Sequence, residues 1–363
     1  MSSIPRLEVA ADTLELPECP TPRPGSEVVW YRESIQMSGV LEGYDVDFQP
    51  VISTPLFGQQ RASSHDAIRL KDRTASSAPN WTCLASSGLI LKPTADEADQ
   101  LASLLQQTVP SAPRHIDLIN EIWLRGYEVF VVGGSVRDVL AGLPTNDVDL
   151  VTTMPLQVLH CLVRGMYRIS EQRPPRAACR NGHIRVGGQV GSLDPYMDLC
   201  VFKHHLPGTA DAIFGSDFER DIWHRDFACN SVYYDPINKV FIDPTGRGLD
   251  DAVGSRLRTV YNSQVRSAYH IGKVAVRAIK LVLKGFGEIV HTDEEVEALI
   301  SNLSALNCEQ RIGYLRAQIF RPVSVADRAG VFDDVRDVFE QLNAGAVFQE
   351  CILPYRGKLV GSE

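Results

Sequence analysis

The segment Val131–Thr152, with the sequence VVGGSVRDVLAGLPTNDVDLVT, constrains the fold more than any other part of the chain. Tyr127–Val132 is apolar and rich in β-branched residues, which predicts a strand that ends at a pair of glycines. Ser135–Ala141 is predicted to be a short helix that its first residue caps and that Gly142 stops. Asp147–Thr152 is then a second strand, which the helix folds back beside the first one. The segment therefore predicts a mixed α/β core.

Two carboxylates stand at the start of the second predicted strand. Side chains alternate between the faces of a strand, so Asp147 and Asp149 point the same way while Val148 points into the core. Converging carboxylates form an oxygen-ligand site that suits Mg²⁺. Such a site serves an in-line displacement in which pyrophosphate leaves. An isolated D-x-D is more often a surface turn or a helix cap, so its neighbours decide the interpretation.

The glycine pair supplies that context. Gly133, Gly134 and Ser135 form a turn at a helix N-terminus, where phosphate groups can approach backbone N–H groups closely because the glycines lack a Cβ. A lone Gly-Gly is usually only a turn. Together with the Arg-Asp pair that follows and the two flanking strands, the turn and the D-x-D indicate adjacent phosphate and metal sites.

This arrangement resembles the head domain of the class II tRNA nucleotidyltransferase (CCA-adding) and bacterial poly(A) polymerase family. That family's pattern is G-G-x-V-R-D, eight residues, then D-x-D, which reads here as Gly133-Gly134-Ser135-Val136-Arg137-Asp138 followed by Asp147-Val148-Asp149. The resemblance covers roughly His115 to Phe320. It implies an α+β fold, in which a polymerase-β-like nucleotidyltransferase head, a mixed sheet with helices, is followed by an all-helical neck region.

Further motifs extend the resemblance downstream. His224–Asn230 (HRDFACN) resembles the family's R-R-D-F-T-x-N, and the stretch from Asp243 to Val260 resembles its D-P-F-G…D…R-T-V. With the glycine motif, these segments imply nucleotide-binding roles for Gly133, Gly134, Ser135, Arg137, Asp138, Arg225, Asp226 and Asn230. The alternatives are a structural Arg225–Asp226 ion pair and an Asn230 that caps a turn. His224 replaces an arginine, which weakens the positive charge at neutral pH.

The resemblance also implies a third carboxylate on a later strand beside the D-x-D. Asp198 occupies the matching place, with Lys203 where the family usually has arginine. An acid in an apolar strand is costly unless a metal or a partner compensates it. We therefore expect Asp198 to act with Asp147 and Asp149 in catalysis, the alternative being an ordinary aspartate of an edge strand.

The neck motif is broken. The family selects CTP or ATP with a segment E-D-x-x-R and further arginines, whereas here His270 and Ile271 replace E-D and Val274 replaces the first arginine. Arg277 and Lys280 remain basic, one helical turn apart, and are expected to contact the nucleotide unless they are only the polar stripe of an amphipathic helix. Because Ile and Val offer no donor or acceptor to a base edge, the motif does not support CCA specificity.

Three regions are expected along the 363 residues. Residues 1–92 are rich in Pro, Ser and Gly and are predicted to be a partly irregular extension with short strands near Glu27–Tyr31 and Leu89–Leu91. Residues 93–262 form the head with its leading helices. Residues 263–363 form a helical neck and body shorter than in the family, with four predicted helices. The second of these, Asp293–Leu306, begins with a capping box of Thr292 and Glu295.

Composition limits the location and the partners. No apolar run reaches the roughly 20 residues of a membrane helix, and no secretory signal opens the chain. The eight cysteines are scattered without a C-x-x-C, which favours reduced thiols in the cytoplasm and no zinc site. The net charge of −9 is unfavourable for extensive nucleic-acid binding. Six arginines between Arg164 and Arg185 are either a small RNA-binding surface or a solvated loop.

Three functions remain open. The first is a Mg²⁺-dependent transfer of a nucleotide from an NTP (ATP, CTP or both) to an acceptor hydroxyl, most simply an RNA 3′ end. The second is an RNA- or nucleotide-binding factor with little turnover, which the broken neck motif favours. The third is nucleotidylation of a protein or a small molecule at the same site. Retention of the complete G-G-x-V-R-D…D-x-D pattern favours an enzyme.

Overall fold

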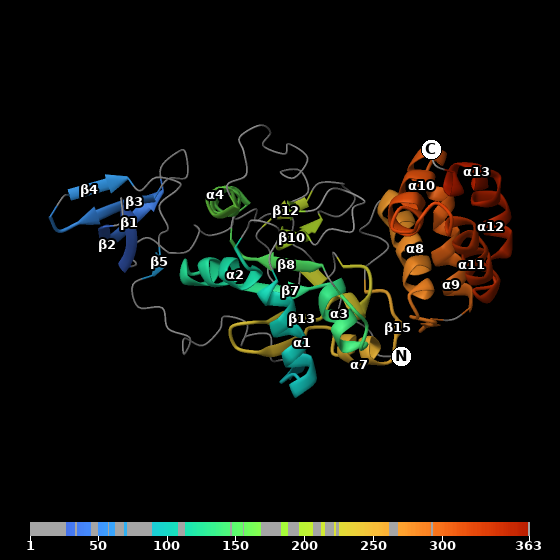
Figure 1. The fold of residues 1–363 in the computed structure, drawn as a ribbon, viewed down its shortest axis with the longest axis horizontal. Helices are drawn as coiled ribbons and strands as arrows, with labels where there is room; N and C mark the ends of the chain where they lie inside the picture. The colour runs from blue at the N-terminus through green and yellow to red at the C-terminus, as the bar shows by residue number, and fades with distance from the viewer. Residues whose placement is uncertain are drawn as a thin grey trace, which may run out of the picture.

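The computed structural model describes residues 27–32, 35–44, 50–56, 58–61, 69–70, 89–107, 113–145, 147–154, 156–167, 183–187, 196–205, 212–214, 221–222, 225–260, 268–291 and 293–361. Figure 1 shows a small N-terminal sheet, a larger sheet with helices beside it, and an all-helical C-terminal region at the opposite end. The predicted mixed α+β architecture is confirmed.

A seven-stranded sheet forms the centre of the head. Its strand order is β6-β14-β13-β7-β8-β10-β9, and every neighbouring pair is antiparallel except β8 and β10, which are parallel. The strands are β6 (Leu89–Leu91), β7 (Val129–Val132), β8 (Val148–Thr152), β9 (His183–Gly187), β10 (Tyr196–Val201), β13 (Tyr233–Asp235) and β14 (Val240–Asp243). The sheet is therefore mixed, as the sequence predicts.

Both faces of the central strands are buried. Val129 and Val131 of β7 pack into a large core with the head helices, whereas Phe130 and Val132 pack with Phe202 in a separate aromatic cluster. The head helices are α1 (Ala95–Gln106), α2 (His115–Leu124), α3 (Gly134–Leu140), α4 (Leu156–Tyr167) and α7 (Gly248–Val253), with the 3₁₀ turn η2 (Ala228–Asn230). Two short pairs complete this part: β11 (Lys203–His205) with β12 (Ala212–Phe214), and β15 (Arg256–Leu257) with β16 (Glu288–Ile289).

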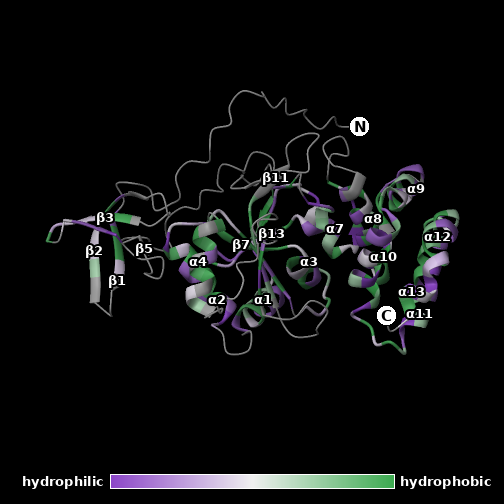
Figure 2. Cartoon of the chain, turned by 90° about the horizontal axis from the view of Figure 1, so that it is seen from above, coloured by the Kyte–Doolittle hydropathy of each residue, from purple (hydrophilic) through white to green (hydrophobic). Residues whose placement is uncertain are grey.

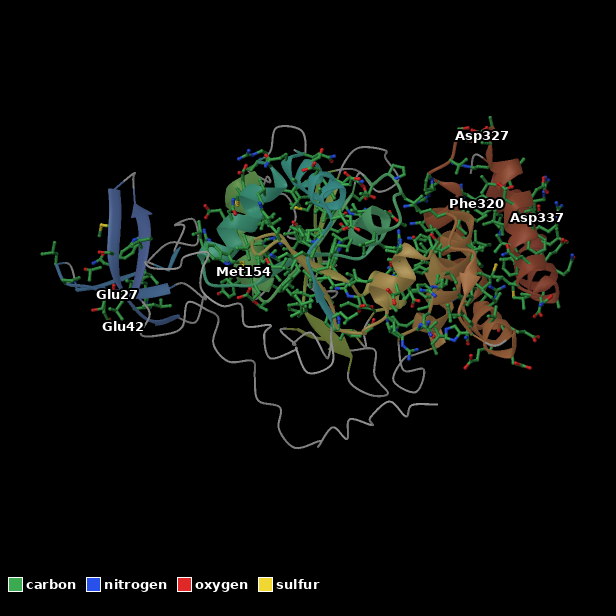
Figure 3. The ribbon with its side chains drawn as sticks, turned by 90° about the horizontal axis from the view of Figure 1, so that it is seen from below. Glu27, Glu42, Met154, Phe320, Asp327 and Asp337 are labelled. Carbon is green, nitrogen blue, oxygen red and sulfur yellow. The ribbon has the colours of Figure 1, made fainter. Side chains whose placement is uncertain are left out.

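The C-terminal region is helical and shares the large core with the head. Figure 2 shows apolar residues on the facing sides of its helices, and in Figure 3 Phe320 lies among the helices while Asp337 lies on their outer side. The elements are α8 (Ala268–Leu283), α9 (Asp293–Ser301), η3 (Asn302–Ala305), α10 (Cys308–Leu315), the π-helical turn η4 (Arg316–Phe320), α11 (Arg328–Gln341), α12 (Gly345–Cys351), η5 (Leu353–Tyr355) and α13 (Arg356–Val360). Strand β15 pairs in parallel with β16, just after α8, and so ties the two parts together.

The N-terminal segment contains more regular structure than the sequence predicts. It forms a five-stranded antiparallel sheet of β1 (Glu27–Arg32), β2 (Ile35–Tyr44), β3 (Pro50–Thr54), β4 (Gly58–Arg61) and β5 (Arg69–Leu70), in the order β4-β3-β2-β1-β5. Val28, Trp30, Leu41 and Ile52 are fully buried and form its core. Only β1 and β6 correspond to expected strands. The strands β2 to β5 were not predicted, because the composition of this segment is rich in Pro and Gly.

The remaining predicted elements lie within a few residues of the observed ones. Thr94 caps α1 in a capping box with Glu97, and Gly126 follows α2 with a positive φ of 95°. The Thr292 capping box lies outside the described residues. The last two of the four predicted C-terminal helices, Glu309–Phe320 and Val331–Leu342, are observed as α10 with η4 and as α11. Helices α12 and α13 were not predicted. Among the described residues no helix is long and apolar enough to span a membrane.

His115, the first residue of α2, provides a test of the head's packing. Its side chain is fully buried, neither ring nitrogen has a hydrogen-bond partner among the described residues, and burial lowers its pKa to about 4. Between pH 6.5 and 4 the unfolded chain binds a proton that the folded chain does not. The free energy of unfolding should therefore fall by up to about 3 kcal/mol as the pH falls through this window.

Urea unfolding at several pH values measures this fall. A His115→Phe variant should lose that part of the pH dependence, whereas His160→Phe on α4, where the histidine is partly exposed, should keep it. Equal pH dependence of His115→Phe and the unmodified chain would show that His115 is not held neutral.

Candidate active site

The glycine turn and the D-x-D lie together as the sequence predicts. Gly133 has a φ of +74°, and a Cβ at this position would stand 3.1 Å from Oδ2 of Asp149. The Gly134 N–H donates to the same oxygen over 3.3 Å. This close approach requires glycine, because a side chain would strain the backbone and displace the carboxylate.

Ser135 has a different role from the predicted one. The N-cap of α3 is Gly133, not Ser135. The Ser135 hydroxyl instead donates to the Asp147 carbonyl and accepts from the Asp149 N–H, both over 3.0 Å. It therefore joins the start of α3 to the start of β8 and fixes the backbone on either side of the buried Val148.

Negative charge is concentrated at Asp149. Burial most of all, together with the charges of Asp198 and Asp147, raises the pKa of its carboxyl to about 6, although the charge of Arg225 and the Gly134 N–H act in the opposite direction. Carboxylates that repel one another in this way favour a bound cation, since a cation relieves the repulsion. The donor set of Asp147 and Asp149 fits an oxygen-preferring ion such as Mg²⁺.

Asp198 lies directly beside Asp149 but makes an ion-pair cluster of its own. The two aspartates are register partners on the parallel strands β8 and β10. On its other side, Asp198 accepts two bonds from Arg185, of 2.7 and 2.6 Å, and lies 2.8 Å from Nε2 of His183. Burial acts to raise its pKa, but hydrogen bonds and charges of His183 and Arg185 bring it below the usual value. β9 lies outside β10, so Asp198 is not on an edge strand.

A buried polar network joins the two sequence motifs of the head. Arg137 donates to Asp138 over 2.9 and 2.7 Å and to the side-chain amide oxygen Oδ1 of Asn230 over 2.7 Å. Asn230 in turn donates to Asp226 over 2.8 Å. All four side chains are at most 9% exposed. The predicted nucleotide-binding residues Arg137, Asp138, Asp226 and Asn230 thus bind one another.

Two basic residues, one on α8 and one directly after it, bind the two ends of this network. Lys284, just past the end of α8, forms an ion pair with Oδ2 of Asp138, and Arg277 donates to Oδ2 of Asp226 over 2.7 Å. Burial acts to raise the pKa of Asp226, yet Arg277 and the hydrogen bonds hold it far below its usual value. The head motifs therefore hold the neck helix in place through two ion pairs two turns apart.

Arg277 and Lys280 interact electrostatically with the D-x-D. The Arg277 side chain is 58% exposed although it is bonded to Asp226. Asp226 raises the pKa of Arg277 most, and Asp149 adds to the effect. Desolvation lowers the pKa of Lys280, as do the charges of Arg277, Arg137 and Lys284, while the charge of Asp147 acts in the opposite direction. Two basic groups of α8 thus interact with the two acidic groups of the D-x-D.

Arg225 does not pair with Asp226. It donates twice to Asp221, over 3.0 and 2.8 Å, and its guanidinium lies 5.3 Å from the centroid of the Tyr233 ring. The Tyr233 hydroxyl donates to the same carboxylate over 2.6 Å. Arg225 is therefore in a structural ion pair with a partner that the sequence did not indicate, although its charge still acts on Asp149.

The downstream motif residues stabilise the fold around this site. Asp243 accepts hydrogen bonds from the Thr245 and Leu249 N–H groups at the start of α7. Asp251 pairs with Arg258 over 3.0 Å. Of the predicted basic stretch, Arg185 bonds to Asp198, while residues 168–182 and His224 lie outside the described residues.

Sequence reasoning missed several members of the site. His183 and Lys284 were not singled out, and Asp221 was not connected with Arg225. Lys284 follows Arg277 by seven residues on one helix face, so helical spacing could have identified it. His183 and Asp221 gave no local signal. Among the described residues no group of three or more His, Cys, Asp or Glu side chains is arranged to hold a metal ion.

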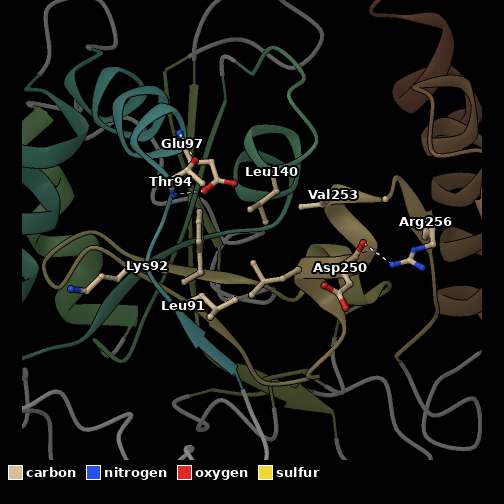
Figure 4. A pocket seen from close by; sticks show the side chains of 11 residues that line it. Leu91, Lys92, Thr94, Glu97, Leu140, Asp250, Val253 and Arg256 are labelled. Carbon is tan, nitrogen blue, oxygen red and sulfur yellow. Dashed lines mark hydrogen bonds between the residues drawn. The ribbon is translucent and has the colours of Figure 1, made fainter.

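A cleft of about 590 Å³ lies elsewhere, between β6, α1 and α7 (Figure 4). Leu91 and Val253 form exposed apolar parts of its wall, and Lys92, Glu97, Asp250 and Arg256 contribute charged groups. It contains none of the predicted site residues.

The comparisons with known proteins agree with the motifs. Residues 129–258 match the family model described as the poly A polymerase head domain. The resemblance to the class II CCA-adding and poly(A) polymerase family is therefore confirmed over the head domain.

Individual relatives match over the same region. Poly(A) polymerase I of Escherichia coli O6:H1 is 29% identical over 125 residues, which are 30% of this chain and 24% of that protein. The CCA-adding enzyme of Streptococcus pyogenes serotype M2 is 29% identical over 129 residues, 35% of this chain and 30% of that protein. The chain thus spans about a quarter to a third of the curated relatives that it matches.

Solved structures with related folds have low sequence identity. The Bacillus stearothermophilus CCA-adding enzyme in complex with CTP is 20% identical, with a TM-score of 0.42, covering 60% of this chain and 51% of that one. A tRNA-processing enzyme in an apo form is 16% identical, with a TM-score of 0.45, covering 65% and 59%.

The buried network predicts a large effect of Arg137→Met on stability. The substitution leaves Asp138 with Lys284 alone and removes the donor to Asn230, so the free energy of unfolding should fall by about 3 kcal/mol. Urea unfolding measures it. Arg336→Met is the matched control, because Arg336 pairs with Asp333 and Asp337 on the surface and should change stability by less than about 0.5 kcal/mol. Equal stabilities of the two variants would contradict the network's role.

Proposed function

We propose that this chain is a Mg²⁺-dependent nucleotidyltransferase that transfers a nucleotide from an NTP to an acceptor hydroxyl, with an RNA 3′ end as the acceptor. The proposal is carried by the contact of the glycine turn with Asp149, together with the electrostatic interaction of the D-x-D with two basic side chains of α8: Asp149 acts on Arg277 and Asp147 acts on Lys280. The phosphates of a nucleoside triphosphate bind both a metal ion and basic side chains, so the triphosphate fits between these two sets of side chains.

The known relatives support the same chemistry. Those that match the head are named poly(A) polymerase I and CCA-adding enzyme. Solved structures of the second kind contain CTP, ATP or a primer tRNA. An RNA acceptor and either of these nucleotides follow by analogy. The broken neck motif argues against CCA addition as such.

In this proposal each residue of the site has a separate role. Asp147 and Asp149 hold Mg²⁺, which, when bound, supplies charge neutralisation at the α-phosphate and at the attacking oxygen. The Ser135 backbone lies in the first turn of α3, where its N–H group can approach a phosphate, while the Gly134 N–H holds Asp149. Arg277 and Lys280 neutralise the β- and γ-phosphates. The acceptor hydroxyl oxygen attacks the α-phosphorus and its proton is released to solvent, while the bond from the α-phosphorus to the oxygen that bridges to the β-phosphorus breaks and pyrophosphate leaves with that oxygen.

Asp198 has a positioning role in this proposal. Its carboxylate is already bonded to Arg185 and His183, so it contributes charge beside Asp149 rather than a free ligand. The same observation favours a second candidate, an NTP- or RNA-binding factor with little turnover. Two acidic side chains that interact with two basic ones can bind a nucleotide and its ion even where the reaction is slow.

The decisive experiment incubates the chain with Mg²⁺, each labelled NTP in turn, and total RNA. The expected result is label on RNA, and a D147A/D149A variant should lower the rate by about a thousandfold or more because it removes the metal ligands. The matched control is D333A/D337A, which removes two exposed aspartates of α11 and should keep full activity.

The other outcomes separate the alternatives. Label on protein would identify a protein acceptor at the same site. NTP binding without incorporation into any acceptor would contradict the transferase and support the binding factor. Incorporation that survives in D147A/D149A would place the chemistry elsewhere.

A further inference from the structure

In the neck helix, the position of the family's first selecting arginine is a valine, which has no group that can recognise a base. Val274 is 2% exposed, and the Lys273 ammonium lies 4.8 Å from the centroid of the Tyr314 ring. A site that selects a nucleotide needs donors or acceptors directed at the base edge. If α8 does not supply them, a neighbouring element must.

The next helix presents a suitable group. Lys280 of α8 donates from Nζ to Oε1 of Gln318 over 3.2 Å. Gln318 lies on η4 and is partly exposed, four residues after Tyr314. Because Lys280 occupies the amide oxygen, the amide nitrogen remains to donate, and no hydrogen bond from it to a described residue is formed.

The backbone around Gln318 is unusual. Arg316–Phe320 form a π-helical turn directly after α10, within a region that is otherwise α-helical and 3₁₀-helical among the described residues. Such turns are rare and are frequent at functional sites, since the extra residue redirects a side chain. Here Ile319 and Phe320 remain buried in the core while Gln318 meets Lys280 at the surface.

We propose that Gln318, held by Lys280, reads the base edge of the incoming nucleotide and so replaces the lost neck motif. The inference rests on the proposed function, because Lys280 is one of the two cations assigned to the triphosphate. Gln318 donates to an acceptor on the base. It is a specificity residue from the body of the molecule rather than from the neck helix.

The test compares the use of the four NTPs by the full chain, by Q318E and by Q318L. Glutamate offers acceptors where the amide offered a donor. Q318E should therefore favour ATP and CTP over UTP, because adenine and cytosine carry an exocyclic amino group that can donate to the carboxylate. The ratio of kcat/KM for ATP or CTP to kcat/KM for UTP should rise by about three- to tenfold. Q318L removes both groups and should bring the four values closer together. The matched control is Q349E, an exposed glutamine of α12, which should leave every ratio unchanged.

Equilibrium binding of each NTP, in the presence of Mg²⁺, to the same four proteins keeps the test independent of turnover. If the unmodified chain transfers no nucleotide, the proposed function fails, but a changed ratio of dissociation constants in Q318E still supports base contact by Gln318. A variant that lowers the use or binding of all four NTPs equally would indicate a merely structural residue and overturn the inference. Equal use and equal binding of all four NTPs by the unmodified chain would also overturn the inference.

Discussion

The architecture of the candidate site depends on one buried polar network, Arg137–Asp138 with Asn230–Asp226, which is bounded by two cations of the neck helix. Buried charges are costly unless they are paired, so each member requires the others. The ion pairs of Lys284 and Arg277 hold α8 at two points, two turns apart. The helix cannot rotate about its axis without breaking one of them. Arg277 and Lys280 therefore keep their orientation toward the D-x-D.

This network changes the meaning of the motif residues. The Arg-Asp pair after the glycines and the Asp and Asn of HRDFACN were predicted to contact the nucleotide; in the structure they bind one another. Through Arg277 and Lys284 they also fix the position of α8. The glycine turn, Asp147 and Asp149 form the part of the site that is left facing the cations, with Ser135 joining α3 to β8.

Some of this could be predicted from the sequence because it depends on short-range periodicity. The alternation of Asp147, Val148 and Asp149 fixes which side chains share a face, and a Gly-Gly before a short helix fixes the turn. The network could not be predicted in the same way, because Arg137 and Asn230 are 93 residues apart and Lys284 and Asp138 are 146 apart. The N-terminal sheet was missed for another reason: its strands alternate weakly, and prolines and glycines between them resemble an irregular segment.

The central claim is that the network holds α8 so that its cations and the D-x-D enclose a metal-bound triphosphate. It is tested most directly by a crystal structure of the full chain with a non-hydrolysable NTP analogue and Mn²⁺, located by its anomalous scattering. The account predicts a manganese peak bonded to Asp147 and Asp149, with the triphosphate between that ion and Arg277 and Lys280. Manganese away from both aspartates, or a triphosphate without contact to α8, would contradict it.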